Sequence, residues 1–221
     1  IDNELLCLLE NETQKYSSYY KVLKYCLSKM RSSYQIDQYM CQIEVPLKEQ
    51  EQIKEKLKEN QLLDDCAFTK AFINDQIYLT NHGPYKIKNE LLKLKIDTDI
   101  IEREISNIDP NVFEEKISTL IKKRINLNKK DSAYLFKQKL NNYLLNLGYS
   151  QQMIAPHLSS IQIDNSKSLQ VVYKNELKKL SKKYSDEELT FRLKNNLRAK
   201  GFSMEDIYKL MESNQFSIEK E

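Results

Sequence analysis

Gly148-Tyr149-Ser150 and Gly201-Phe202-Ser203 are two copies of one turn, and they lie 53 residues apart. Another step of 53 residues toward the N-terminus reaches Lys95-Ile96-Asp97, a looser copy of the same turn. Apolar residues also recur at matching distances from the three turns. They are Ile87 and Leu91, Leu140 and Leu144, and Leu193 and Leu197 before the turns, and Ile101, Ile154 and Ile207 after them. A fixed period of this length indicates tandem structural repeats.

Each turn predicts a corner between two helices. The apolar pairs before the turn are four residues apart, a spacing that forms one stripe on a helix. Glycine ends that helix because it adopts the left-handed conformation without a steric penalty, so Lys95 should make its turn less favourable. The expected N-caps of the next helix are Asp97, Ser150 and Ser203. The residues expected to form hydrophobic staples with the isoleucines after the caps are Ile96, Tyr149 and Phe202.

A further helix precedes each corner, over residues 67–79, 112–125 and 168–182. The sequence therefore predicts an all-α fold of about four tandem three-helix repeats in an elongated curved array. The first repeat is a degenerate copy at an offset near 51 residues, and Pro46 marks the start of its third helix. The predicted boundaries are 1–12 for the end of a truncated N-terminal segment, 13–63 for repeat 1, 64–109 for repeat 2, 110–162 for repeat 3 and 163–221 for repeat 4.

The composition agrees with a helical protein. The chain of 221 residues has only 3 Gly and 4 Pro, which leaves little room for the many tight turns of a β-sandwich or barrel. No apolar run approaches the roughly 20 residues that cross a bilayer, so we expect no membrane contact. The four cysteines form no CxxC pair and predict reduced, partly buried thiols in a cytoplasmic protein. They are Cys7, Cys26, Cys41 and Cys66.

The net charge of +3 conceals a basic segment. Residues 111–200 contain 18 Lys or Arg against 8 Asp or Glu, an excess of 10 positive charges. Such a segment is often a solvated helix face, and it can also bind nucleic acid or an acidic protein surface.

Several short motifs, in order, resemble the RecX family of RecA regulators. They are Arg31-Ser32-Ser33, Leu63-Asp64-Asp65 with Phe68-Thr69 and Phe72-Ile73, Gly83-Pro84-Tyr85-Lys86-Ile87 with Glu90-Leu91, and the two later Gly-aromatic-Ser turns. The resemblance runs from about Tyr16 onward and is to the longer form of the family. Lys95 in place of the usual glycine, and Thr69 where alanine is common, depart from the pattern.

The resemblance implies a regulatory protein of DNA repair, recombination and the SOS response. It implies a non-enzymatic monomer that binds the RecA filament on DNA and inhibits the recombinase, ATPase and co-protease activities of RecA, with DNA itself as a further partner. Two alternatives stay open at this point. One is a helical-repeat scaffold that binds a protein through apolar grooves, and the other is a helical repeat that binds DNA without a filament.

The repeat alignment selects the candidate contact residues. Lys86, Lys139 and Arg192 occupy one position on the second helix, and Lys88 and Lys194 share another. Cations at equivalent places in a superhelix would line one surface suited to an acidic or polyanionic partner, although each could be an ordinary solvated residue. Arg31, beside the expected capping serines, completes the set.

Other polar residues predict no chemistry. Asp64 and Asp65 stand just before a helix, where an N-cap is more typical than a catalytic pair. His82 and His157 have no partner at metal-ligand spacing, and no phosphate-binding glycine loop occurs. We therefore expect no metal, no cofactor and no enzymatic activity.

Overall fold

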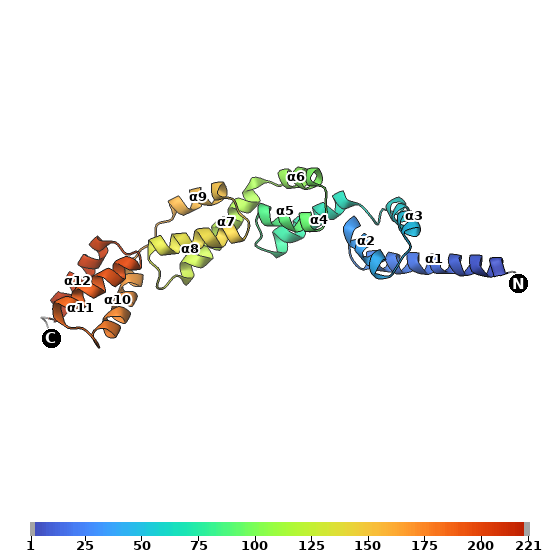
Figure 1. Cartoon of the computed structure of the whole chain (residues 1–221). Helices are drawn as coiled ribbons and strands as arrows, with labels where there is room; N and C mark the ends of the chain where they lie inside the picture. The colour runs from blue at the N-terminus through green and yellow to red at the C-terminus, as the bar shows by residue number, and fades with distance from the viewer. Residues whose placement is uncertain (1–2, 219–221) are drawn as a thin grey trace. The chain divides into compact units, whose positions relative to one another are not determined.

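The chain is built from helices joined by short loops. The computed structural model describes the backbone of residues 3–218 and the side chains of residue 13 and residues 16–213. Within this part of the chain there are helices and no strand, which confirms the predicted all-α class. The chain divides into two compact units, Ile1–Asp109 and Pro110–Glu221, and each is described by itself (Figure 1).

The helices that contact one another most closely fall into consecutive sets of three, here called groups 1 to 4. Unit 1 holds group 1, with α1 (Asn3–Ser28), α2 (Ser33–Gln42) and α3 (Leu47–Glu59), and group 2, with α4 (Asp65–Leu79), α5 (Pro84–Lys93) and α6 (Thr98–Ser106). Unit 2 holds group 3, with α7 (Pro110–Leu127), α8 (Ala133–Asn146) and α9 (Gln151–Ser160), and group 4, with α10 (Ser166–Leu180), α11 (Asp186–Ala199) and α12 (Met204–Ile218).

A residue in the left-handed conformation ends the second helix of every group. These residues are Glu44 (φ 59°), Lys95 (φ 57°), Gly148 (φ 89°) and Gly201 (φ 80°). The N–H of the next residue then donates to the carbonyl five residues before it, which closes a Schellman motif. The bonds join Val45 to Met40, Ile96 to Leu91, Tyr149 to Leu144 and Phe202 to Leu197, with N···O distances of 3.0, 3.3, 3.2 and 3.3 Å. The corner therefore persists where glycine is replaced, at a steric cost of about 1 kcal/mol.

The predicted N-caps of the third helices are confirmed. Ser150 Oγ accepts a hydrogen bond from the N–H of Met153 at 3.3 Å. Ser203 Oγ accepts from Asp206 at 3.1 Å, and Asp97 Oδ1 accepts from Asp99 at 2.8 Å. Side-chain caps satisfy donors that the first turn of a helix cannot pair internally, so these short helices begin at defined residues.

Group 1 begins its third helix differently. Pro46 is the N-cap, one residue before the start of α3, and it provides no side-chain bond. Gln50 stands where the other groups have a buried isoleucine, and its Nε2 donates to the carbonyl of Val45 at 2.8 Å. A hydrogen bond thus replaces the apolar staple contact in this group.

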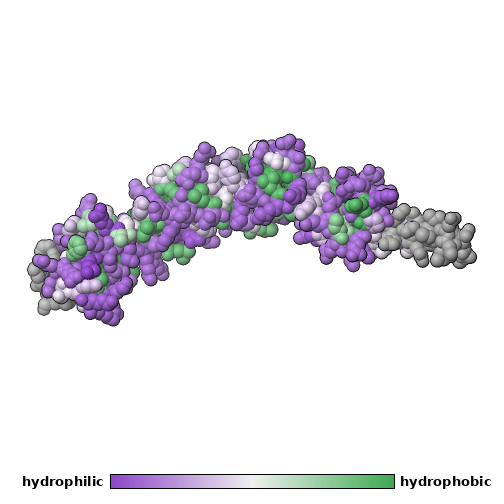
Figure 2. Space-filling view, in the orientation of Figure 1, coloured by the Kyte–Doolittle hydropathy of each residue, from purple (hydrophilic) through white to green (hydrophobic). Residues whose placement is uncertain are grey.

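Groups 1 and 4 each pack an apolar core around the corner. In group 4, Leu193, Leu197, Phe202 and Ile207 are almost fully buried and belong to one cluster with Leu169 of the first helix. Burying a side chain of this size stabilises the fold by about 1.5–3 kcal/mol. On the face that Figure 2 shows, hydrophilic residues cover most of both units.

Neighbouring groups within a unit are joined by hydrogen bonds at the start of the second helix. The N–H of Ser33 donates to Asp65 Oδ1 at 2.8 Å in unit 1, and the N–H of Ala133 donates to Asn165 Oδ1 at 2.7 Å in unit 2. In unit 2, the buried Ser132 also donates its hydroxyl to the carbonyl of Lys200 at 2.7 Å. The second helix of one group therefore rests against the next group by polar contacts.

Two predictions near the N-terminus differ from the structure. The boundary predicted after residue 12 falls inside α1, which runs unbroken from Asn3 to Ser28 because no glycine or proline interrupts this segment. Of the cysteines predicted to be partly buried, Cys41 is exposed, whereas Cys26 is buried and its burial raises the pKa of the thiol. The Cys7 side chain lies outside the described residues.

Candidate partner-binding surface

The three aligned cations of the second helices lie nine residues before the left-handed residue of their groups, and two of them have acidic neighbours. Lys139 Nζ lies 2.7 Å from Asp131 Oδ1, and both groups are solvent-accessible. Arg192 Nε lies 2.9 Å from Glu188 Oε1, and its guanidinium stacks over the Tyr184 ring at 4.2 Å. Lys86 is partly exposed and forms no ion pair with any residue whose side chain is described. Lys139 and Arg192 belong to unit 2 and Lys86 to unit 1, so one continuous row stays a prediction.

The second set of aligned cations connects the second and third helices of their own groups. Lys88 Nζ forms an ion pair with Glu102 Oε1 on α6 at 2.6 Å. Lys194 Nζ lies 4.6 Å above the Tyr208 ring on α12. Asn141 takes this position in group 3, where its Oδ1 is buried without a hydrogen-bond partner among the described residues. In groups 2 and 4 the lysine therefore links the second helix to the third as well as carrying charge.

Arg31 is held by aromatic stacking at the junction of α1 and α2. Its guanidinium carbon lies 3.9 Å from the centre of the Tyr25 ring. That ring stacks in turn on Tyr39 of α2, at 4.1 Å and an angle of 9° between planes. Arg31 Nη2 also donates weakly to Ser28 Oγ at 3.4 Å. The residue thus packs two helices of group 1 together, and its side chain is only partly exposed to solvent.

Alignment of the repeats missed a denser set of cations at the ends of the first helices in unit 2. Basic edge 3 is the end of α7 and the following loop, with Lys122, Lys123, Arg124, Lys129 and Lys130. Basic edge 4 is the corresponding part of α10, with Lys174, Lys178, Lys179, Lys182 and Lys183. All ten side chains are exposed, and none forms an ion pair with a described residue. The charge excess in residues 111–200 was the signal that could have located them.

The predicted N-cap at the start of α4 is confirmed, and its neighbour has a further role. Asp64 Oδ1 accepts from the N–H groups of Cys66 and Ala67 at 2.8 and 3.0 Å. Asp65 accepts from Ser33 of the preceding group. Both carboxylates therefore accept hydrogen bonds from backbone N–H groups.

The histidines are held by hydrogen bonds within their groups. His157 on α9 bonds through Nε2 to Glu114 of α7, and its Nδ1 lies 3.4 Å from Ser118 Oγ. His82 Nδ1 lies 2.7 Å from Gln76 Oε1. Among the described residues, no three or more His, Cys, Asp or Glu side chains are grouped so that they could hold a metal ion.

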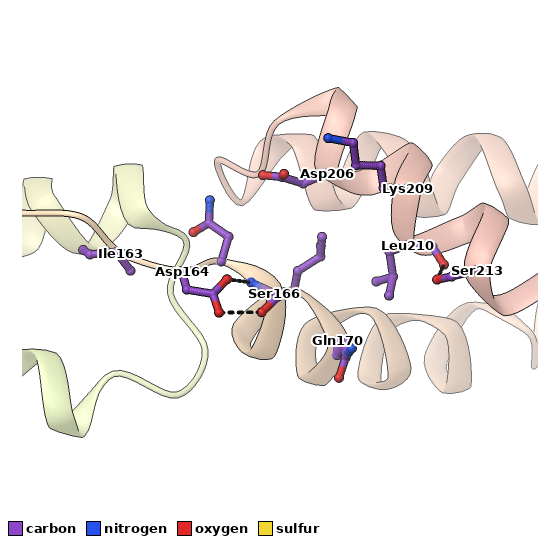
Figure 3. A pocket seen from close by; sticks show the side chains of 10 residues that line it. Ile163, Asp164, Ser166, Gln170, Asp206, Lys209, Leu210 and Ser213 are labelled. Carbon is purple, nitrogen blue, oxygen red and sulfur yellow. Dashed lines mark hydrogen bonds between the residues drawn. The ribbon is translucent and has the colours of Figure 1, made fainter.

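A hollow of about 460 Å³ lies between α10 and α12 in group 4 (Figure 3). Its polar groups are largely engaged locally. Asp164 accepts from the N–H and hydroxyl of Ser166 at 2.8 and 2.7 Å, which lowers the pKa of its carboxyl, and Lys209 pairs with Glu205 at 2.6 Å. Leu169 and Leu210 supply apolar walls. This surface is an open groove between helices, with no convergent set of reactive groups.

No helix in the described part of the chain is both long enough and apolar enough to span a membrane. A comparison with descriptions of known protein families finds no match. Individual proteins do match over most of their length. The chain is 32% identical over 190 residues to the regulatory protein RecX of Streptococcus agalactiae serotype III (strain NEM316), covering 84% of this chain and 73% of that one. It is 29% identical over 205 residues to the regulatory protein RecX of Halalkalibacterium halodurans, covering 90% and 76%.

Solved structures support the same fold. A crystal structure of RecX from Lactobacillus salivarius superposes with a TM-score of 0.63 at 23% identity, covering 68% of this chain and 99% of that chain. Another crystal structure of regulatory protein RecX gives the same TM-score and covers 70% and 76%. Similarity of both sequence and fold over most of the chain leads to one assignment. This protein belongs to the RecX family of regulatory proteins.

Proposed function

We propose that this protein binds the filament that RecA forms on DNA and inhibits the recombinase, ATPase and co-protease activities of RecA. It acts as a cytoplasmic monomer and performs no chemistry itself. The observation that carries the proposal is the relationship to regulatory proteins named RecX over most of both chains. The motif resemblance, from Arg31-Ser32-Ser33 onward, supplies RecA as the partner.

The arrangement of cations supports a charged partner. A cation stands at one equivalent position of the second helix in groups 2, 3 and 4, as Lys86, Lys139 and Arg192. Successive groups can therefore present positive charge to successive copies of a repeating partner. A RecA filament on DNA is such a partner. The ion pairs of Lys139 and Arg192 are solvent-accessible, and exposed pairs contribute only about 0–1 kcal/mol, so a partner carboxylate or phosphate can replace them at low cost.

The test is RecA-dependent ATP hydrolysis on single-stranded DNA, with and without this protein at stoichiometric amounts. We expect the rate to fall, and an unchanged rate would contradict the proposal. The triple variant Lys86→Glu, Lys139→Glu and Arg192→Glu should lose the effect and keep its melting temperature. A matched control, Lys48→Glu, Lys56→Glu and Lys58→Glu, reverses three exposed charges on α3 and should inhibit normally.

Salt dependence distinguishes the scaffold alternative. Binding through cations weakens steeply as salt rises, whereas binding through apolar grooves keeps its affinity. Because glutamate at positions 139 and 192 would face Asp131 and Glu188, the Lys86→Gln, Lys139→Gln and Arg192→Gln variant removes the charge without adding repulsion. Normal inhibition by both triple variants would show that the row is a solvated face.

A further inference from the structure

The acidic residues closest in sequence to the two basic edges of unit 2 are held by other cations. Residues 122–130 contain no Asp or Glu, and Asp131, which follows them, pairs with Lys139 at 2.7 Å. Glu176, inside basic edge 4, lies 3.5 Å from Lys200 and accepts from Asn196 at 3.0 Å. These two ion pairs therefore leave basic edge 3 without an acidic partner among the described residues and basic edge 4 only partly compensated.

The end of a first helix does not by itself require so many cations. Lysine near a helix C-terminus gains about 0.3–1 kcal/mol from the helix dipole, which would favour a few of them in any helix. The equivalent end of α4 in group 2, over residues 74–82, contains no Lys or Arg and ends instead with the exposed Tyr78 and Leu79. Seven of the ten cations of basic edges 3 and 4 also lie outside the last helical turn, either earlier in the helix or in the loop that follows it. Fold stability thus does not account for the clustering.

The two basic edges lie on one side of unit 2 and are separated from each other along it. The loop of basic edge 3 leads into α8, whose first N–H is bonded to Asn165 at the start of α10. Basic edge 4 lies at the opposite end of α10, and 15 helical residues span about 22 Å. The α7–α8 and α10–α11 loops both lie on the lower side of unit 2 as drawn in Figure 1. This placement fits a linear ligand better than a compact one.

We infer that basic edges 3 and 4 bind the phosphate backbone of a nucleic acid, through contacts that do not depend on base sequence. A nucleic acid is a linear polyanion with closely spaced charges, and lysine and arginine neutralise its phosphates with release of counterions. Arg124 is already oriented, because its guanidinium stacks on Tyr143 at 3.9 Å. Asp186 and Glu187 begin α11 beside basic edge 4 and offset part of its charge, so basic edge 3 contributes more of the affinity.

The inference requires no RecA and can therefore fail or succeed separately from the proposed function. The experiment measures the fluorescence anisotropy of a labelled oligothymidine of about 20 nucleotides, and of a duplex of equal length, as the full chain is added at several salt concentrations. The edge variant is Lys123→Gln, Lys129→Gln and Lys130→Gln. The control variant, Lys48→Gln, Lys56→Gln and Lys58→Gln, removes the same charge from exposed lysines of α3.

We expect the parent chain and the control variant to bind, and the edge variant to bind at least about 10-fold more weakly at low salt. The slope of log affinity against log salt should fall by about 2 for the single strand, since each lost phosphate contact removes about 0.7. Equal binding by the edge and control variants would overturn the inference, as would no binding by the parent chain. Normal oligonucleotide binding by the edge variant, combined with lost binding to a RecA-coated strand, would also overturn it and assign the edge to an acidic protein surface.

Discussion

The N–H of Ala133 donates a hydrogen bond to Asn165 Oδ1 at 2.7 Å, and this bond joins the start of α8 to the start of α10. The same relationship occurs 100 residues earlier between Ser33 and Asp65, at 2.8 Å. In both cases the first residue of a second helix donates to the next group. The first N–H groups of a helix have no partner within it, so an acceptor from a neighbouring group can bond to them without disturbing either helix. Within each unit, a polar bond thus joins the two groups.

The substitution Asn165→Ala should weaken that contact. It removes the acceptor for the Ala133 N–H, and losing one such bond costs about 1 kcal/mol. We expect a lower urea midpoint and faster hydrogen exchange at Ala133. The control Asn195→Ala removes an exposed amide on α11 and should change neither quantity. Unchanged exchange at Ala133 in the Asn165 variant would show that the bond does not hold the groups together.

Gly201→Ala should destabilise unit 2 by about 2 kcal/mol or more. Residue 201 has φ 80°, where an L side chain is strained, and an added Cβ would lie 2.7 Å from Ser132 Oγ of the preceding group. The reciprocal change Lys95→Gly should relieve strain at φ 57° and stabilise unit 1 by up to about 1 kcal/mol. Chemical denaturation of both variants measures the change in the free energy of unfolding, which should fall for Gly201→Ala and rise for Lys95→Gly. A change of the same sign in both variants would contradict the corner geometry.

Phe202→Ala should cost about 3 kcal/mol or more, because its ring is 3% exposed in the core of group 4. Phe191→Ala provides the matched comparison, since that ring on α11 is 66% exposed. We expect the Phe191 variant to melt within a few degrees of the parent chain. Similar melting of the two variants would mean that the residue after the glycine does not anchor the corner.

Burial raises the pKa of Tyr149 to about 12 in the folded state, above the ordinary value of 10. The folded state therefore favours the protonated phenol. The stability linked to this group is fully present below pH 10 and is lost as the pH rises toward 12. Urea unfolding at pH 9 and pH 11 should show a larger loss for the parent chain than for Tyr149→Phe. Parallel losses in the two proteins would indicate that Tyr149 does not titrate as a buried group.

The corners were predictable because their signals are local. Gly201, Phe202 and Ser203 are adjacent, and each residue type has one preferred role at the end or start of a helix. Glu44 forms the same corner, but glutamate is not a marker of the left-handed conformation, so this residue was not identified from the sequence. The unbroken α1 escaped prediction because an apolar segment before residue 12 looks the same whether a helix continues or restarts there.

The surroundings of the candidate contact residues could not be predicted in the same way. The bond between Ser33 and Asp65 joins residues 32 positions apart, and no periodic pattern indicates it. The repeat alignment placed Lys88 and Lys194 at equivalent positions of the second helix. Their contacts with Glu102 and Tyr208, however, depend on how the third helix packs. Side-chain partners across helices follow from tertiary geometry, which a single sequence specifies only indirectly.

The backbone bonds that close the corners span five residues or fewer, so the turn of each corner forms from the chain around it. A gene segment that encodes one whole set of three helices could therefore be duplicated in tandem without rebuilding any existing interior. To join its neighbour, the new copy would need an Asp or Asn side chain at the start of its first helix. That side chain would accept a hydrogen bond from the first N–H of the second helix in the preceding copy. The length of such a protein can therefore change during evolution by whole sets of three helices, while the existing sets keep their structure.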